Sequence, residues 1–362
     1  MNKTWLVYGA TGYTGQLIVE EAHKQGLNLI MAGRSEDKLA EMKKQFGYEY
    51  RCFDLSSRQT IASQLEDVDV ALNCAGPFSE TAKPFIAACL HAQAHYLDIT
   101  GEIAVFEHAH LLDHSAEKAN IVVCPGVGFD VVPTDCLAKA LSEKLPDADT
   151  LWLGFSSRSA LSPGTAKTSV EAIGDGGKVR RDGKIIDVPL AYRVRKIDFG
   201  DGSCTATTIP WGDVSTAFYS TGIQNIDVYI PLSDNKVKQM KRLEKFRWIM
   251  KSKWLVNFLK RRIDAKVRGP NEDKRARLET KVWGEVMNPA GDIVTGRITT
   301  ANGYDLTGHA AIAISQHLLN NDIEPGFKTP SMIMGSSFVE QLPRSSTFVW
   351  EDTRSEGKDA LE

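Results

Sequence analysis

The first 145 residues alternate short apolar runs with stretches in which apolar residues recur at three- and four-residue steps. Runs of this length between helical patterns are typical of a parallel sheet whose connecting helices cover both faces. The expected strands lie near residues 4–8, 27–32, 48–53, 68–73, 96–99 and 121–124. Helices are expected between them, the first over the amphipathic stretch 16–24.

The pattern changes near residue 149 to longer β-type stretches separated by glycine-bearing turns. The expected strands are 150–156, 185–188, 227–231, 281–287 and 292–300, and residues 288–291 predict a hairpin turn between the last two. One helix is expected over 164–174, where backbone N–H groups near Thr165 would face an anionic substrate. A second helix is expected over 306–319 and is predicted to return to the first domain.

Three glycines, Gly9, Gly12 and Gly15, stand between the first expected strand and the first expected helix. In a strand, turn and helix of this kind, the first glycine allows a tight turn and the second lets the backbone approach a pyrophosphate. The third permits close packing of the helix on the strand, and the helix N-terminus attracts phosphate. An ordinary glycine turn is the alternative interpretation. The context favours a dinucleotide-binding site.

The second expected strand ends in Arg34 and Ser35, where a site for NAD(H) would usually carry Asp or Glu on the ribose 2′-hydroxyl. A guanidinium can instead pair with a 2′-phosphate and lie against the adenine ring. A surface arginine at a strand end is the alternative. We therefore predict NADP(H) as the cofactor.

The loops after the later strands also carry special residues, and the carboxyl ends of parallel strands are where open sheets bind ligands. Residues 54–55 are suited to the adenine, residues 73–78 to the ribose and pyrophosphate, and residues 124–135 to the nicotinamide ring. Each loop alone is compatible with simple turn chemistry. The predicted cofactor contacts are Gly9, Thr11, Gly12, Tyr13, Thr14, Gly15, Arg34, Ser35, Asp54, Leu55, Asn73, Ala75, Gly76, Pro77, Phe78, Thr100, Gly101, Gly128 and Phe129.

Together these patterns predict an α/β fold with a Rossmann doubly wound parallel sheet over residues 1–146. A second α+β domain, built on a mixed or antiparallel sheet, is expected over 147–304 for substrate binding and dimerisation. Residues 305–362 are expected to form a helix and tail that return to the first domain.

Residues 236–268 form a basic amphipathic segment in which Lys and Arg are interleaved with apolar residues, including Trp248 and Trp254. One interpretation is a pair of helices whose long cationic side chains lie over the rim of the sheet. The other is contact with a lipid surface, or a lid over an apolar substrate.

Composition narrows the class of protein. The chain has 362 residues, with 42% hydrophobic and 25% charged residues, which is typical of a soluble protein large enough for two domains. The net charge of −3 argues against a nucleic-acid partner. The six cysteines form no CxxC pair, so neither a metal site nor a disulfide framework is indicated. The N-terminal apolar run breaks at Gly9, and a cytoplasmic protein is expected.

Several segments resemble the saccharopine dehydrogenase-like oxidoreductases: GATGYTG, AGRS, LNCAGPF, HYLDITGE and PGVGFDVVPTD. Further segments are similar to the branch that contains the trans-acting enoyl reductases of bacterial lipid synthesis: GP at Gly269, WGEV at 283–286, NGYDLT at 302–307 and PGFKTPS at 325–331. The resemblance covers nearly the whole chain. It implies an NADP(H) domain, a second α+β domain, hydride transfer and a homodimer through the second domain.

The carry-over from the family is firmest for Gly9, Gly12, Gly15, Arg34, Asn73, Gly76, Gly101, Gly128 and Asp130. One departure is the sequence Pro163, Gly164 and Thr165, where relatives tend to show Gly-Gly-Thr. A contact from that turn to cofactor or substrate is therefore in doubt.

Candidate catalytic groups are few. The first domain has no Tyr-xxx-Lys pair, and His95, which precedes a strand, is interpreted as structural. Asp130 and Glu102 follow strands at the ligand-binding edge, where burial can raise a carboxyl pKa enough for acid–base work. Helix capping, or holding the nicotinamide carboxamide, is the alternative role for either residue.

Three functions remain open. The first is an NADPH-dependent oxidoreductase that transfers hydride to an activated C=C or C=N bond, with a lipid-like enoyl substrate favoured. The second is a saccharopine- or opine-type dehydrogenase acting on amino-acid-derived imines, with Lys167, Arg193 and Arg195 as candidate carboxylate-binding residues. The third is a non-catalytic NADP(H)-binding sensor or a partner of a larger synthase. The expected partners are a small-molecule substrate, a second copy of the chain and, through 236–268, a membrane surface.

Overall fold

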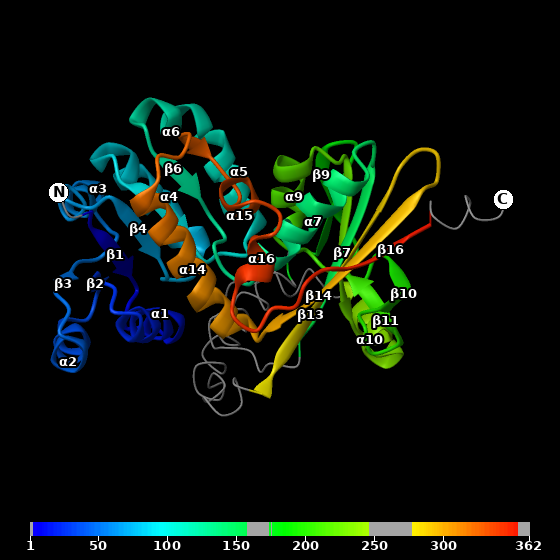
Figure 1. Cartoon of the computed structure of the whole chain (residues 1–362), viewed down its shortest axis with the longest axis horizontal. Coiled ribbons are helices and arrows are strands. Elements are labelled where there is room, and N and C mark those ends of the chain that lie inside the picture. Colours follow the sequence, from blue (N-terminus) through cyan, green and yellow to red (C-terminus); the bar gives the residue numbers. More distant parts are fainter. Residues whose placement is uncertain (1–2, 158–173, 175, 246–276, 354–362) are drawn as a thin grey trace. The chain divides into compact units, whose positions relative to one another are not determined.

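The computed structural model describes residues 3–157, 174, 176–245 and 277–353. The chain forms two compact units. Unit 1 comprises residues 1–132 and 303–334, and unit 2 comprises residues 133–302 and 335–362. Each unit contains one sheet, and the two sheets differ in strand direction and in how their faces are covered (Figure 1).

Unit 1 is built on a seven-stranded sheet in the order β15, β6, β5, β4, β1, β2, β3. Every pairing recorded in this sheet is parallel. The strands are β1 (Trp5–Tyr8), β2 (Ile30–Gly33), β3 (Tyr50–Cys52), β4 (Val70–Asn73), β5 (His95–Asp98), β6 (Val122–Cys124) and β15 (Gly326–Phe327). The strand order reverses between β1 and β4, and ligands of doubly wound sheets bind at such a reversal.

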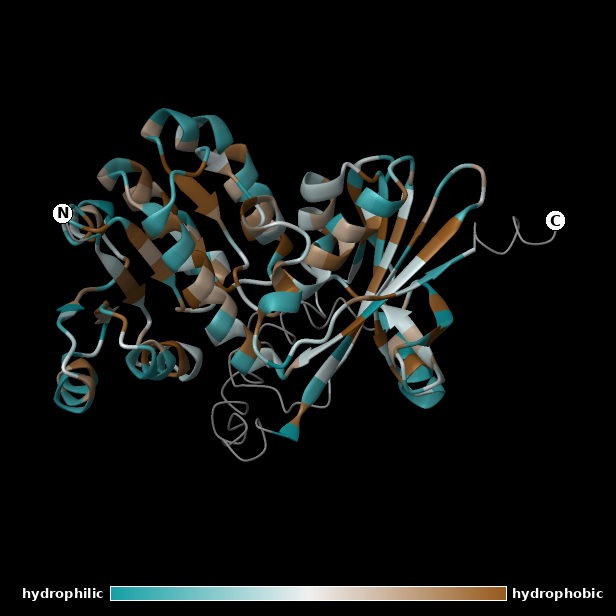
Figure 2. Ribbon diagram, in the orientation of Figure 1, coloured by the Kyte–Doolittle hydropathy of each residue, from teal (hydrophilic) through white to brown (hydrophobic). Residues whose placement is uncertain are grey.

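Helices connect these strands. They are α1 (Tyr13–Lys24), α2 (Glu36–Phe46), α3 (Arg58–Ser63), α4 (Phe78–Ala92), α5 (Ile103–Leu111), α6 (Asp113–Ala119), α14 (Gly303–Asn320) and α15 (Pro330–Met334). The helix α14 packs against α1 and β4, whereas α4 packs against α3 and α5. All residues of β1, β4 and β6 are buried, as expected for strands with both faces covered. Figure 2 shows apolar strands flanked by helices with hydrophilic outer sides.

Unit 2 is built on a nine-stranded mixed sheet. Its main path runs β10, β11, β12, β7, β13, β14, β16, and β8 joins β12 to β9. The strands are β7 (Thr150–Ser157), β8 (Gly177–Arg181), β9 (Lys184–Val188), β10 (Val194–Asp198), β11 (Ser203–Thr208), β12 (Asn225–Pro231), β13 (Glu279–Met287), β14 (Ile293–Ala301) and β16 (Val349–Asp352). Its described helices are α7 (Val132–Lys144), α9 (Asp213–Thr221), α10 (Asp234–Glu244) and α16 (Phe338–Gln341).

One face of the second sheet is closed by α7. A Cβ atom at Gly284 of β13 would lie 2.8 Å from the Leu141 side chain, and one at Gly296 of β14 would lie 2.8 Å from the Leu137 side chain. The absence of side chains at these two positions lets the helix lie directly on the strands. The predicted hairpin is confirmed, because Lys281 pairs with Thr299 and Met287 with Ile293 in antiparallel register.

The described elements follow the predicted fold class, with differences at their ends. The first helix begins at Tyr13 rather than residue 16, and β2 begins at Ile30 rather than residue 27. Five strands were not predicted: β8, β10, β11, β15 and β16. These are short or polar, for example VRKID in β10 with one buried residue, so hydropathy alone does not distinguish them from loops.

The units also divide the chain at other positions than the predicted domains. The helix α7 groups with unit 2 although it lies before residue 146, because its apolar side chains pack against β13 and β14. Within the predicted return segment, residues 303–334 belong to unit 1, and residues from 335 onward belong to unit 2, where β16 pairs with β14. The tail therefore contributes to both units.

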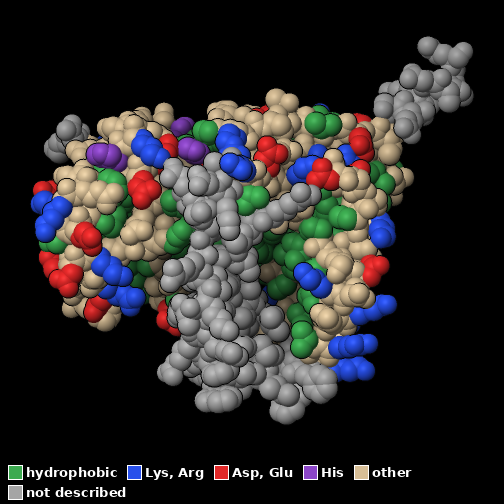
Figure 3. Space-filling view, turned by 90° about the horizontal axis from the view of Figure 1, so that it is seen from below, with side chains coloured by type: hydrophobic (Ala, Val, Ile, Leu, Met, Phe, Trp, Pro, Cys, Tyr) green, Lys and Arg blue, Asp and Glu red, His purple; other side chains and the backbone are tan. Residues whose placement is uncertain are grey.

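Some predictions fall outside the described residues. The helix expected over 164–174, including Thr165 and Lys167, lies there almost entirely, as does the part of the basic segment beyond residue 245. The described start of that segment is in α10. None of the helices in the described residues combines the length and apolar character needed to cross a membrane. Figure 3 shows Lys and Arg interspersed with Asp and Glu over the described part of one face.

Candidate functional site

The predicted cofactor contacts all lie in unit 1, in or next to the loops that follow strands β1 to β6. Parallel strands bring their carboxyl ends to one edge, so loops distant in sequence become neighbours there. The glycine turn after β1 and the loop after β4 are in direct contact, since a Cβ atom at Gly9 would lie 2.9 Å from the backbone nitrogen of Ala75.

The glycine turn leaves no room for side chains at its first and third positions. Gly9 has a φ of +81°, a left-handed conformation that favours glycine, and its N–H donates to the Ala32 carbonyl at 2.8 Å. A Cβ atom at Gly15 would overlap the Gly9 carbonyl oxygen and lie 2.9 Å from the Gly9 carbonyl carbon. The helix α1 therefore packs directly on the turn, as the glycine spacing predicted.

Gly12 is the N-cap residue of α1, and among the described residues no side chain caps the helix there. Its own N–H donates to the Gly9 carbonyl at 2.9 Å, which closes the turn. The first N–H groups of a helix have no partner within the helix and carry partial positive charge. The N-terminus of α1, with Tyr13 and Thr14, thus presents an electropositive surface suited to a pyrophosphate.

Arg34 and Ser35 lie directly after β2. Arg34 is exposed, and within the described residues no hydrogen bond or ion pair engages its guanidinium. Ser35 is the N-cap residue of α2 but makes no capping side-chain bond among these residues. Two donors at the end of β2 are thus available for a phosphate group, and residues of this kind suit a 2′-phosphate.

Asp54 and Leu55 follow β3. The Asp54 carboxylate accepts hydrogen bonds from the hydroxyl and backbone N–H of Ser56, at 2.5 and 2.9 Å. These bonds, with a smaller contribution from the positive charge of Arg34, hold the pKa of Asp54 below its usual range. An ionised acceptor beside the guanidinium fits an adenine amino group.

The loop after β4 is held by Asn73, which is fully buried. Its side-chain oxygen accepts from the Ala75 N–H at 3.0 Å, and its amide donates to the Thr81 hydroxyl at 3.2 Å. The Thr81 hydroxyl in turn donates to the Ala75 carbonyl at 2.7 Å. Gly76 and Pro77 follow and lead into α4 at Phe78. Asn73 is therefore a supporting residue: its hydrogen bonds fix the loop backbone that a ligand would contact.

Asp98, at the end of β5, joins two of the loops. Its buried carboxylate accepts from the Tyr96 hydroxyl at 2.6 Å and from the backbone N–H groups of Thr100 and Gly126, each at 2.9 Å. Burial raises the pKa of Asp98 to about 6, against the opposite effect of these hydrogen bonds. The sequence analysis did not assign a role to Asp98.

Glu102 accepts hydrogen bonds from the backbone N–H groups of Phe78 and Ser79, at 2.9 and 2.8 Å. These are the first two residues of α4, and its N-cap residue, Pro77, offers no side-chain cap. A carboxylate at this position satisfies N–H groups that the helix leaves unpaired and favours the positive end of its dipole. The geometry therefore gives Glu102 a capping role, which the sequence analysis held as its alternative.

Asp130 is the stronger candidate for acid–base chemistry. Burial, with a smaller contribution from the nearby negative charge of Glu102, raises the pKa of Asp130 to about 7. A Cβ atom at Gly101 would lie 2.9 Å from the Asp130 carboxylate, so the glycine makes room for this side chain. A carboxyl group that titrates near neutrality can both donate and accept a proton at physiological pH.

Residues 5–124 match the family described as the saccharopine dehydrogenase NADP binding domain. The match lies within unit 1 and covers about a third of the 362 residues. The coenzyme of this part of the chain is therefore NADP(H). It fits the glycine turn, the N-terminus of α1 and the exposed guanidinium of Arg34.

Two relatives match a little less than half of the chain. The trans-acting enoyl reductase of Mycobacterium bovis is 28% identical over 184 residues, covering 46% of this chain and 44% of the relative. The saccharopine dehydrogenase-like oxidoreductase of Rattus norvegicus is 25% identical over 202 residues, covering 49% and 47%. The aligned region thus spans less than half the length of these relatives. The motifs that resemble the family, by contrast, are spread over nearly the whole chain.

A solved structure shares the fold over a longer range. Saccharopine dehydrogenase (L-Glu forming) of Saccharomyces cerevisiae superposes with a TM-score of 0.66 at 12% identity, covering 96% of this chain and 100% of that chain. At this identity the likeness shows the fold alone. The NADP binding domain and the second unit are therefore both parts of a known architecture.

The site also depends on contacts that the sequence patterns did not predict. Gly128 and Phe129 lie against the first turn of α14, at Thr307, almost 180 residues further along the chain. Tyr13 of the NADP binding domain lies against Tyr304 of the same helix. The return of this helix to the first domain was predicted from the sequence, but the contacts of Thr307 and Tyr304 were not, because no local pattern indicates which side chains meet.

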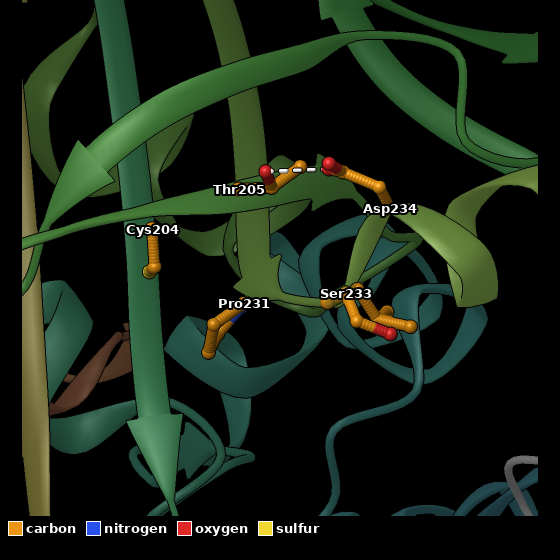
Figure 4. A pocket seen from close by; sticks show the side chains of 6 residues that line it. Cys204, Thr205, Pro231, Ser233 and Asp234 are labelled. Atoms are coloured by element: carbon orange, nitrogen blue, oxygen red, sulfur yellow. Dashed lines mark hydrogen bonds between the residues drawn. The ribbon is translucent and has the colours of Figure 1, made fainter.

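Two remaining features lie apart from these loops. His95 accepts a hydrogen bond from the Val122 N–H at 2.9 Å and joins β5 to β6, which fits the structural role predicted for it. A shallow pocket in unit 2, of about 410 Å³, is lined by residues 204–205 and 231–234 at the start of α10 (Figure 4). Thr205 donates to Asp234 at its rim. The pocket contains none of the predicted site residues.

Proposed function

We propose that this chain is an NADPH-dependent oxidoreductase that transfers hydride to an activated C=C or C=N bond, with a lipid-like enoyl substrate favoured. Two observations together support it most. Part of the chain matches an NADP binding domain, and the loop predicted to face the nicotinamide carries Asp130, a carboxyl group with a pKa of about 7. The name of the Mycobacterium bovis relative supports the enoyl substrate.

The chemistry needs little from the protein beyond position and one proton. NADPH supplies the hydride when it is bound. Reduction of an enoyl group adds this hydride to one carbon and a proton to the other, so a proton donor is needed. We propose that Asp130 donates that proton and regains it from solvent, and Asn73 and Asp98 hold the surrounding loops in place.

The test is NADPH oxidation followed by absorbance with a panel of candidate substrates. We expect turnover with an enoyl thioester and a turnover number that falls in Asp130→Asn while the Kd for NADPH is kept. Turnover with a keto acid plus an amino acid, and none with enoyl thioesters, would contradict the substrate class.

The second candidate is a saccharopine- or opine-type dehydrogenase. The support for it is the name of the yeast protein that shares the fold. A dehydrogenase of this type requires cationic groups for substrate carboxylates. Two of the candidates already have carboxylate partners: Arg193 lies 3.0 Å from Asp227 and Arg195 lies 2.9 Å from Glu285. These ion pairs make the second candidate less favoured than the first.

A non-catalytic NADP(H) sensor or synthase partner is the third candidate. It is supported if the chain binds NADPH with no turnover across a panel that includes both substrate classes. The homodimer through the second domain also remains a proposal. Light scattering on the purified chain tests it, since a mass of one chain at micromolar concentration would contradict it.

Localisation in the cytoplasm and contact with a membrane through 236–268 are proposals too. Flotation with anionic vesicles tests the contact. We expect salt-sensitive binding that decreases when Trp248 and Trp254 are both replaced by Ala. Undiminished binding by that variant, or no binding by the parent chain, would contradict it.

A further inference from the structure

The first turn of α14 touches two segments of unit 1 that are predicted to face the coenzyme. It follows β14 in the sequence and starts at Gly303, well outside the range 5–124 that matches the NADP binding family. The remainder of the helix lies along α1 and β4 (Figure 1). Its start is therefore placed at the same edge of the sheet as the glycine turn.

The first contact fixes the loop after β6. The Thr307 hydroxyl accepts from the Phe129 N–H at 3.0 Å and donates to the Gly303 carbonyl at 2.7 Å. One side-chain oxygen thus connects the loop to the helix. The approach is close on both sides, since a Cβ atom at Gly128 would lie 2.9 Å from the Thr307 side chain and one at Gly303 would lie 3.0 Å from the Phe129 ring.

The second contact fixes the start of α1. The rings of Tyr13 and Tyr304 meet edge to face, with centroids 5.1 Å apart and an interplanar angle of 83°. Such a pair contributes about 0.5–1.5 kcal/mol beyond the area that it buries. Tyr13 directly follows Gly12, so the position of this ring is coupled to the turn that receives the pyrophosphate.

We propose that the first turn of α14 is a distant part of the coenzyme site, in which Thr307 and Tyr304 are positioning residues for the loop at Phe129 and for Tyr13. The proposal rests on the coenzyme site of the proposed function. It assigns α14 to the pyrophosphate and nicotinamide half, because the first turn of this helix contacts Phe129 and Tyr13.

Pre-ordering is the physical basis. A loop that is already held in its bound conformation loses less conformational entropy when a ligand binds, and the affinity gains by that difference. Removal of a single hydrogen bond from a buried N–H typically costs about 1–3 kcal/mol. The effect should appear in ligands that reach the second half of the coenzyme, and not in ligands that stop at the adenosine.

The experiment measures Kd by calorimetry for two ligands, NADPH and adenosine 2′,5′-bisphosphate. The bisphosphate carries the 2′-phosphate but lacks the nicotinamide half. For Thr307→Val we expect the Kd for NADPH to rise about tenfold, which is roughly 1.4 kcal/mol, and the Kd for the bisphosphate to stay unchanged. Thr307→Ser restores the hydroxyl and should bind NADPH almost as tightly as the parent chain.

Tyr304 provides an independent pair of variants. Tyr304→Ala should weaken NADPH binding about tenfold, roughly 1.4 kcal/mol, and Tyr304→Phe should bind NADPH more tightly than Tyr304→Ala, because it keeps the edge-to-face contact with Tyr13. This side chain is partly exposed, so the pair decides the question even if Thr307→Val does not fold. The matched control is His309→Ala. It removes a contact to Glu21 of 3.6 Å between the same two helices, further from the turn, and should leave both Kd values unchanged.

The outcomes separate this inference from the function on which it rests. If the parent chain binds NADPH while Thr307→Val and Tyr304→Ala bind it equally well, the inference is overturned and the proposed function stands. Equal weakening of NADPH and the bisphosphate would also overturn it, since α14 would then only support the whole unit. If the parent chain binds neither ligand, the proposed function fails and the inference with it.

Discussion

The two ends of the candidate coenzyme site are built in different ways. At the adenosine end, Arg34 and Asp54 are exposed and make few contacts with the rest of the chain. At the nicotinamide end, Asp98 is fully buried and bonded to three neighbouring groups, and Asp130 is half-buried. One end of the candidate site presents side chains in solvent, and the other presents a preassembled hydrogen-bond network.

The difference indicates how each end can be changed. An exposed side chain is replaced at little cost to folding, so substitutions at the adenosine end should alter affinity and selectivity alone. Members of a buried network are coupled to one another and to stability. Substitutions at the nicotinamide end should therefore alter stability, pH dependence and turnover together.

The largest expected effect is at Gly15, the turn that joins the two ends. Gly15→Ala places a methyl group against the Gly9 carbonyl, which cannot move aside without displacing β1 or α1. We expect a loss of roughly 3 kcal/mol in the free energy of unfolding. NADPH and NADH binding should both become undetectable by calorimetry.

Gly308→Ala is the matched control for this substitution. It is a helical glycine of α14, and a Cβ atom there would meet no atom within 4 Å. The alanine should be neutral or stabilise by about 0.5–1 kcal/mol. Similar stability of the two variants would mean that α1 does not need its close approach to the turn.

The next largest effect is expected at Asp130. Its pKa rises from 3.8 in the unfolded chain to about 7 in the folded chain, so the folded state holds the extra proton between these values. This group therefore makes the protein less stable as the pH rises from about 4 to 7. Asp130→Asn removes the buried charge and should increase the stability at pH 8 by up to about 4 kcal/mol.

Turnover distinguishes catalysis from structure in the same variant. Loss of a general acid typically costs about a hundredfold or more, so Asp130→Asn should be more stable and yet nearly inactive. Urea unfolding at several pH values, compared with the parent chain, isolates the contribution of Asp130 from that of Asp98. Full activity in the stabilised variant would contradict a catalytic role for Asp130. The two ends of the site would then differ only in burial and hydrogen bonding.

At the adenosine end, Arg34→Ala should act on selectivity. Loss of charge-assisted hydrogen bonds to a 2′-phosphate should weaken NADPH binding by about tenfold to a hundredfold, with NADH binding and the unfolding free energy unchanged. Calorimetry with both coenzymes measures this. Arg58→Ala, an exposed arginine at the start of α3, is the control. A loss of stability in Arg34→Ala would show that the adenosine end is also part of a network.

The smallest effect is expected at Glu102. The glutamine in Glu102→Gln keeps one acceptor oxygen but loses the charge at the N-terminus of α4, so about 1 kcal/mol of stability should be lost. Turnover should decrease only slightly if capping is its role. A large decrease in turnover with unchanged stability would instead assign Glu102 to catalysis.

Sequence patterns found the first unit because its signals are local. Apolar runs fix the central strands, and the spacing of Gly9, Gly12 and Gly15 predicts a turn in which the crowding at Gly15 comes from Gly9, six residues earlier. The residues after each strand could be named as ligand candidates because parallel strands place their ends at one edge. Arg34 could be singled out since its position relative to the strand end carries the chemical meaning.

The sequence by itself determined the fold class, the hairpin, the nucleotide turn and the loops that surround it. Only the tertiary structure decided which side chains support those loops. Asp98 holds Gly126, and Thr307 holds Phe129, across distances in sequence that no periodicity spans. The division of the chain between the units was also decided at this level, by where α7, α14 and β16 bury their apolar faces. Local propensity acts over a few residues, whereas hydrogen bonds and packing join whatever the fold brings within reach.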